Sequence, residues 1–167
     1  SSLFSVEACI FIIHAISSNI LKTMSASRKK SKTDSVRTPQ YIIDIVKKEF
    51  GEILFDPAPY NPQFNPLKDV DGLKREWGPV SFVNCPYSRV KPWFKKSREE
   101  WLKGKTIILF IKLQCLGTQY CRQYSPGAEV RVLTRKVTFE GYDGTALFNN
   151  IFVIWRAGKT SNVLSFM

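Results

Sequence analysis

An apolar run stops abruptly in the middle of the stretch Val80-Ser81-Phe82-Val83-Asn84-Cys85-Pro86-Tyr87. Residues 80–83 have strand composition, and the following residues end the strand, since proline fits a strand end better than a strand centre. An amide and an aromatic ring are thus expected at the carboxyl edge of a sheet, where open α/β folds bind ligands. Such groups can bind the amino group and the face of a base. They are also common where an ordinary strand enters a turn, so the tetrapeptide alone leaves both interpretations open.

The segments around this stretch predict alternating helices and strands. Thr38 is expected to cap a helix whose first residue is Pro39 and which ends at Gly51. Lys91 to Leu102 is predicted to form an amphipathic helix. Further strands are expected at residues 53–55, 106–111, 128–133, 135–139 and 150–155. This order predicts an α/β fold with a three-layer arrangement and a mostly parallel sheet.

Composition narrows the class of protein. The chain has 167 residues, enough for one domain with a sizeable core. Its net charge of +11 favours a polyanionic partner, with nucleic acid before an acidic membrane surface. The four cysteines and the single histidine, His14, match neither a zinc site nor a disulfide framework. A reducing, intracellular location is therefore expected, and a catalytic triad that needs histidine is not.

Residues 1–36 are expected to be an N-terminal extension that is flexible and partly non-native. The apolar run from Ala8 to Ile16 is too short to span a bilayer, and no basic region precedes it, as a signal peptide would require. Met24 precedes a basic, serine-rich segment and is expected to be the native start, with an amphipathic N-terminal helix as the alternative. The main domain is expected at residues 37–160, followed by a tail at 161–167.

Several motifs occur in a fixed order along the chain. They are Thr38-Pro39-Gln40, Phe55-Asp56-Pro57-Ala58, Asp71-Gly72-Leu73 followed by Trp77, and Phe82 to Ser88 followed by Trp93. In this order they resemble the phage-type, Dam-like DNA adenine-N6-methyltransferases of phages and large DNA viruses, from about Arg37 to Trp155. The resemblance implies a Rossmann-like methyltransferase fold with antiparallel C-terminal strands. It also implies S-adenosylmethionine as methyl donor and adenine in double-stranded DNA as the target.

The resemblance assigns the catalytic residues. The family's tetrapeptide, Asn-Pro-Pro-Tyr, falls on Asn84, Cys85, Pro86 and Tyr87. It implies that the Asn84 side-chain oxygen and the Cys85 carbonyl accept hydrogen bonds from the target amino group, while Tyr87 stacks on the flipped base. This chemistry depends on orientation and electrostatic placement and needs no metal. Cysteine in place of proline keeps the carbonyl but loses the fixed φ.

The resemblance also assigns binding residues. Those implied to bind the donor are Thr38, Pro39, Asp56, Pro57 and Asp71, with Thr38 near its methionine end and Asp71 near its adenosine. Those implied to bind DNA are Ser88, Arg89, Lys91 and Arg135. For Asp56 the alternative is a loop carboxylate that caps nearby amides. The loop after Asp56 also lacks the glycines of larger methyltransferases, which allow close approach of a nucleoside.

Two other functions fit the same residues. A catalytically inactive relative would bind nucleic acid through the same basic and aromatic side chains, and a structural protein would keep only the fold. Asn84, Pro86 and Tyr87 together favour the enzyme, while Cys85 favours the inactive alternative. These patterns specify neither the DNA recognition sequence nor the oligomeric state.

Overall fold

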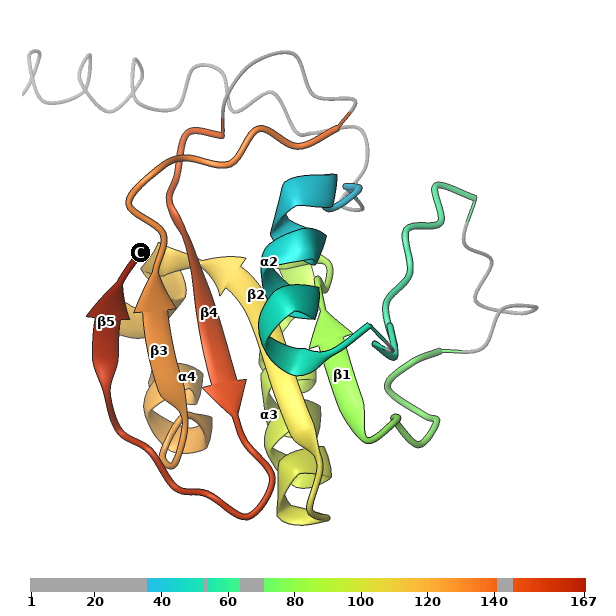
Figure 1. Ribbon diagram of the computed structural model, residues 1–167, viewed down its shortest axis with the longest axis vertical. Helices are drawn as coiled ribbons and strands as arrows, with labels where there is room; N and C mark the ends of the chain where they lie inside the picture. The colour runs from blue at the N-terminus through green and yellow to red at the C-terminus, as the bar shows by residue number, and fades with distance from the viewer. Residues whose placement is uncertain (1–35, 53, 64–70, 141–145) are drawn as a thin grey trace, which may run out of the picture. The chain divides into compact units, whose positions relative to one another are not determined.

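The centre of the fold is a five-stranded sheet in the order β1-β2-β4-β3-β5. The computed structural model describes residues 36–52, 54–63, 71–140 and 146–167 (Figure 1). The strands are β1 (Val80–Val83), β2 (Thr106–Lys112), β3 (Glu129–Val132), β4 (Asn150–Trp155) and β5 (Leu164–Phe166). The helices are α2 (Gln40–Phe50), α3 (Val90–Leu102) and α4 (Gln119–Tyr124). The expectations for residues 1–35, including a start at Met24, lie outside the described residues.

The sheet is mostly parallel, as the sequence predicts. β1 is parallel to β2 and β3 is parallel to β5, while β4 is antiparallel to its neighbours β2 and β3. β1, β2, β3 and β5 therefore run in one direction. Of the expected antiparallel C-terminal strands, β3 and β4 do pair antiparallel, whereas β5 is parallel to β3. Next to β1, Phe55 adds a single parallel bridge to Ser81, and its N–H donates to the Val80 carbonyl at 2.9 Å.

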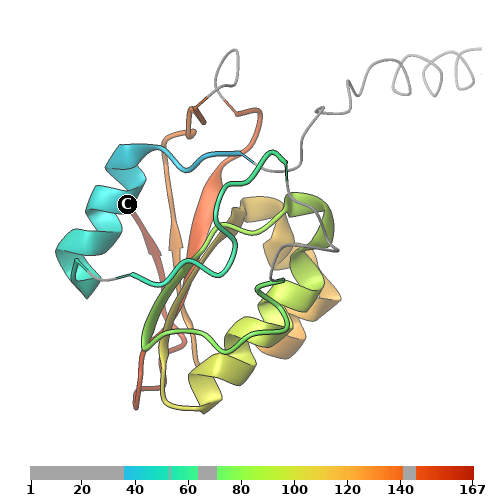
Figure 2. The same cartoon turned by 90° about the vertical axis from the view of Figure 1, so that its right-hand side faces the viewer.

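Helices cover both faces of the sheet and produce three layers (Figure 2). On one face, Ile42 and Val46 of α2 pack in a cluster that includes Phe110 of β2. On the other face, Phe94 of α3 packs with Leu109 of the same strand. Residues 107–111 contact both layers in alternation, so an uninterrupted apolar run fits this central strand.

The start of α2 differs from the prediction. The helix begins at Gln40 with Pro39 at the N-cap, and no side chain caps it. The predicted cap by Thr38 is wrong, because its hydroxyl accepts a hydrogen bond from Asn84 instead. The predicted helix end is confirmed, since the Gly51 N–H donates to the Lys47 carbonyl and Gly51 has φ of 99°.

Two predictions near the C-terminus are corrected. Residues 135–139 form no strand, although Val137 and Phe139 are buried between exposed neighbours as strand residues would be. The segment does not join the sheet, because both edges of β4 are paired and β5 occupies the outer edge of β3. Its Val137 carbonyl accepts a hydrogen bond from the Ala146 N–H instead. Residues 161–167 are not a separate tail, because they contain β5, which pairs with β3.

The domain also includes a residue before its predicted start at 37. Val36 packs against the cluster beneath α2, and its carbonyl accepts a hydrogen bond from Asn84. Within the described residues, no helix has the length and apolarity needed to cross a membrane.

Candidate active site at the carboxyl edge of the sheet

One edge of the sheet collects polar residues from four parts of the chain. The parallel segments at Phe55, β1 and β2 all end there, and Asp56, Asn84 and Lys112 mark their ends. β4 runs the other way, so its first residue, Asn150, lies at this same edge and pairs with Lys112. Ligands of open α/β sheets bind at this edge.

A pocket of about 150 Å³ opens beside these residues. It is lined by Val36, Arg37, Thr38, Asp56, Ala58, Tyr60 and Asn84. The structure therefore brings together three predicted site residues, Thr38, Asp56 and Asn84, from separate segments. Pro39, Pro57 and Asp71, which were also predicted to bind the donor, are not among the lining residues.

The Asn84 amide is held in one orientation. Its Nδ2 donates to Thr38 Oγ1 at 2.9 Å and more weakly to the Val36 carbonyl at 3.4 Å. Because a backbone carbonyl can only accept, the NH2 group must face Val36, and this fixes which side of the amide carries Oδ1. The Oδ1 atom therefore lies on the side of the amide away from Thr38 and Val36.

Asp56 contributes a negative charge to the pocket. Its Oδ1 accepts a hydrogen bond from the Ala58 N–H at 2.8 Å, so this oxygen has the capping role considered as the alternative. Arg75 donates to the Asp56 carbonyl at 3.1 Å and stacks over Phe55. Although the residue as a whole is exposed, desolvation of its carboxyl group raises the pKa of Asp56, and the Ala58 bond and the Arg75 charge oppose this shift.

The predicted residues outside the pocket have local structural roles. Asp71 Oδ1 accepts a hydrogen bond from the Leu73 N–H at 2.9 Å and so builds the turn at residues 71–74. Cys85 is only 3% exposed and packs in the cluster under α3. Pro86 leads into a 3-10 turn, Tyr87–Arg89, and its carbonyl accepts a hydrogen bond from the Arg89 N–H.

Tyr87 is held across the ends of two strands. Its hydroxyl accepts a hydrogen bond at 2.9 Å from Nδ2 of Asn150, and its ring meets Phe139 and Phe148 edge to face. Burial raises the pKa of the Tyr87 hydroxyl, so the group stays protonated. The Lys112 ammonium lies 5.0 Å from the centre of the Tyr87 ring.

The residues predicted to bind DNA are exposed. Ser88, Arg89 and Lys91 lie where the chain leaves the tetrapeptide and enters α3. Arg135 follows β3, whose end lies at the same edge as the ends of β1 and β2. These positions leave the four side chains accessible, and DNA contact remains a prediction.

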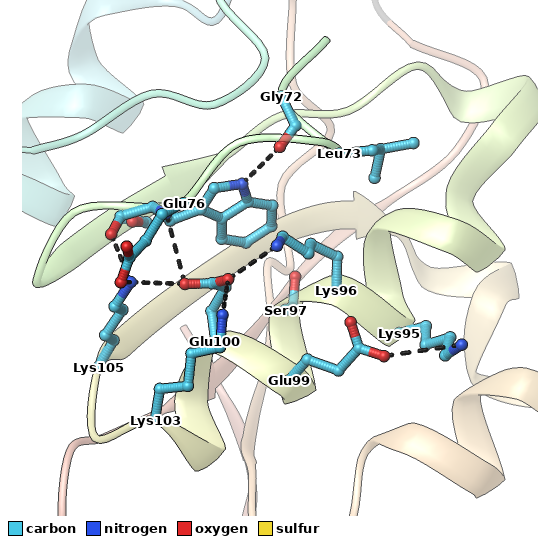
Figure 3. A network of polar contacts seen from close by, with 12 residues as sticks. Gly72, Leu73, Glu76, Lys95, Lys96, Ser97, Glu99, Glu100, Lys103 and Lys105 are labelled. Carbon is cyan, nitrogen blue, oxygen red and sulfur yellow. Dashed lines mark hydrogen bonds and ion pairs between the residues drawn. The ribbon is translucent and has the colours of Figure 1, made fainter.

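A buried carboxylate lies at the C-terminal end of α3 (Figure 3). Glu100 has no exposed surface, because lysines 96, 103 and 105 cover it with N···O distances of 2.8, 2.9 and 2.6 Å. Burial alone would raise the pKa of Glu100, but the hydrogen bonds from these lysines lower it to about 2. Glu100 also accepts a hydrogen bond from the Trp77 N–H at 3.4 Å, which ties the loop before β1 to α3.

Several residues at this edge were not predicted as site residues. Arg37 and Tyr60 line the pocket, with the guanidinium 5.3 Å from the ring centre. Lys112 and Asn150 contact Tyr87 from β2 and β4. The positions of Lys112 and Asn150 at the ends of predicted strands could have indicated a site. This indication requires knowing that β4 runs antiparallel to β2, which brings the two residues together.

The described chain is a mixed α/β protein with a mostly parallel five-stranded sheet and a polar pocket at the carboxyl edge. Compared with known proteins, it matches no family model, no curated protein and no solved structure. In the described residues, no group of three or more His, Cys, Asp or Glu side chains could hold a metal ion. A more specific assignment of fold and function therefore rests on the chemistry of the site.

Proposed function

We propose that this chain is an S-adenosylmethionine-dependent methyltransferase that modifies adenine in double-stranded DNA. The main support is the meeting of Thr38, Asp56 and Asn84 around one pocket. These residues lie far apart in the sequence, and the motifs that contain them are the ones that resemble the phage-type enzymes. The proposed fold is accordingly the Rossmann-like methyltransferase fold.

The charges of the pocket suit one part of the donor. Arg37 and Asp56 both line it, so a cation and an anion face one ligand, although Arg37 also pairs with Glu140 at 3.7 Å. The methionine end of the donor carries a carboxylate and an ammonium group, which match this pair. The volume of about 150 Å³ is below the ~300 Å³ at which typical small-molecule sites begin. We therefore assign the pocket to the methionine part of the donor.

The chain's own residues would orient the target. S-adenosylmethionine supplies an activated methyl group when it is bound. The Asn84 Oδ1 and the Cys85 carbonyl would accept hydrogen bonds from the two N–H groups of the adenine amino group and so direct its lone pair toward the methyl group. Thr38 and Val36 hold the Asn84 amide from the other side, so the acceptor is preorganised. The amino nitrogen gains the methyl group and loses one proton to solvent.

The test is methyl transfer by the purified protein. It is incubated with labelled donor and mixed-sequence duplex DNA, and the nucleosides are then analysed for N6-methyladenine. We expect Asn84→Ala to abolish transfer while the fold is retained. Gln123→Ala removes an exposed amide from α4 and should leave transfer unchanged. Transfer near the parent rate in the Asn84 variant would remove the active-site assignment.

A nucleic-acid-binding protein without catalysis is the second candidate. Lys112, Phe139 and Phe148 already surround the Tyr87 ring, on which a base would have to stack. Calorimetry with S-adenosylmethionine separates the two candidates, because only the enzyme needs the donor. DNA binding without any donor binding would favour the second.

A further inference from the structure

Lys112 is held at the candidate active site by aromatic rings. It is the last residue of β2, one strand away from the end of β1 and Asn84. Its ammonium nitrogen lies 5.0 Å from the centre of the Tyr87 ring and 4.4 Å from that of Phe148. The residue is half-buried, so the position of its charge is restricted by its surroundings.

Lys112 differs from two other half-buried cations, which pair with carboxylates. Lys105 pairs with Glu100, and Arg131 pairs with Glu49. Among the described residues, no carboxylate lies within ion-pair distance of Lys112. Aromatic faces attract its charge but offer no lone pairs to its three N–H donors. The ammonium group therefore retains hydrogen-bonding capacity toward an anionic ligand.

The neighbouring ring is fixed in place. Asn150 is fully buried, and its Nδ2 donates to the Tyr87 hydroxyl at 2.9 Å and to the Ile111 carbonyl at 3.3 Å. Its Oδ1 is buried without a partner among the described residues. The Asn150 side chain therefore acts through its NH2 group, which holds the Tyr87 hydroxyl. A fixed aromatic ring thus has a cation over its face.

A nucleotide has the complementary pair of groups. Its base has an aromatic face, and its phosphate lies one sugar ring away. Sites for nucleic acid strands combine aromatic platforms with cations in this manner. We infer that Lys112 binds the DNA phosphate beside the nucleotide whose base is placed on Tyr87. This inference rests on the proposed function, because it requires DNA as the ligand. The Lys112 ammonium covers one face of the Tyr87 ring. A base that stacks on this face would displace the ammonium, which would then bind the neighbouring phosphate.

The test measures how salt changes DNA affinity. A fluorescent duplex with a central mismatched adenine is used, because a mismatched base is easily flipped. Each phosphate contact contributes about −0.9 to the slope of log K against log salt. Lys112→Gln should therefore make the slope shallower by about 0.9. The affinity that the variant loses relative to the parent should then be about eightfold greater at 0.1 M salt than at 1 M. Lys112→Arg keeps the charge and should keep the slope.

Lys159→Gln is the matched control. It removes the same charge from an exposed residue in the turn after β4, at the opposite edge of the sheet. An unchanged slope in Lys112→Gln would overturn the inference, and so would an equal loss in Lys159→Gln. Circular dichroism checks folding, and Lys112→Met, which keeps the aliphatic stem, replaces the glutamine variant if that variant is unfolded.

The outcome is separable from that of the proposed function. Donor binding is measured by calorimetry on the same proteins. If the parent binds no donor but its salt slope depends on Lys112, the phosphate site stands and the methyltransferase proposal fails. If the parent methylates DNA and the slope does not depend on Lys112, only the phosphate site fails.

Discussion

Gly72 lies so close to Pro57 that a β-carbon on Gly72 would stand 1.8 Å from the Pro57 carbonyl oxygen. The two residues belong to different loops, one directly after Asp56 and the other before β1. Trp77 holds the second loop in place, since its indole N–H donates to the Gly72 carbonyl at 2.8 Å. The position of the Asp56 loop is therefore coupled to the loop that Trp77 anchors.

We predict that Gly72→Ala weakens donor binding without touching the pocket directly. The added methyl group must displace Pro57 and with it Asp56, and overpacking of this kind costs about 1–3 kcal/mol of stability. Gly117→Ala is the control, because a β-carbon there meets no atom within 4 Å. Calorimetry with S-adenosylmethionine and urea unfolding measure the two effects. Unchanged values for both would show that the two loops are not coupled.

The Thr38 hydroxyl is predicted to act through Asn84. Thr38→Val removes the acceptor of the 2.9 Å hydrogen bond and keeps the side-chain shape. The amide then keeps only the weaker 3.4 Å bond to the Val36 carbonyl, so methyl transfer should fall about 10- to 100-fold, while the free energy of unfolding falls by about 1 kcal/mol. Thr38→Ser retains the hydroxyl and should remain close to the parent. Equal rates in the valine and serine variants would contradict the role of this bond.

The ring and the hydroxyl of Tyr87 should be separable. Tyr87→Phe removes the acceptor for Asn150 and should lower the free energy of unfolding by about 1 kcal/mol, with DNA affinity retained. Tyr87→Ala removes the stacking surface as well, which is worth about 1–3 kcal/mol for a bound base. DNA titration and urea unfolding of both variants test this. Equal DNA affinities in the two variants would argue against stacking.

Glu100 should stabilise the protein in a pH-dependent manner. Its pKa is lowered from 4.5 to about 2, so its contribution is fully present above pH 4.5 and is lost as the pH falls toward about 2. Glu100→Gln should lower the free energy of unfolding near neutral pH by about 3 kcal/mol, and this difference should shrink in acid. Glu99→Gln, at an exposed neighbour that pairs with Lys95, should change stability by less than about 1 kcal/mol. A pH-independent difference would show that the Glu100 charge is not what stabilises the fold.

Local sequence signals predicted the helix at residues 40–50 but not the role of its first neighbours. Threonine before proline is a common helix start. The pattern cannot reveal that the Thr38 hydroxyl instead accepts a hydrogen bond from Asn84, 46 residues away in the sequence. The strand at 106–111 was predictable because a central strand is apolar on both faces. The meeting of Thr38, Asp56 and Asn84 was expected only from the order of motifs.

Strand pairing limited the rest of the prediction. Residues 135–139 alternate in burial like a strand, yet pairing depends on whether a neighbouring strand has a vacant edge. β5 has only three residues and little pattern, so its place beside β3 is decided by tertiary contacts. Lys112 and Asn150 escaped prediction for the same reason, since their proximity follows from the reversed direction of β4.

The reversed strand β4 also affects how the chain can be made. It is inserted between β2 and β3, although it follows both in the sequence. While the ribosome is still synthesising residues 113–149, one edge of the apolar strand β2 has no partner, and exposed edges of this kind promote aggregation. The sheet can close only when residues 150–155 have emerged, and such long-range pairing is slow. The nascent protein is therefore expected to need protection by chaperones until nearly all of the described chain has been synthesised.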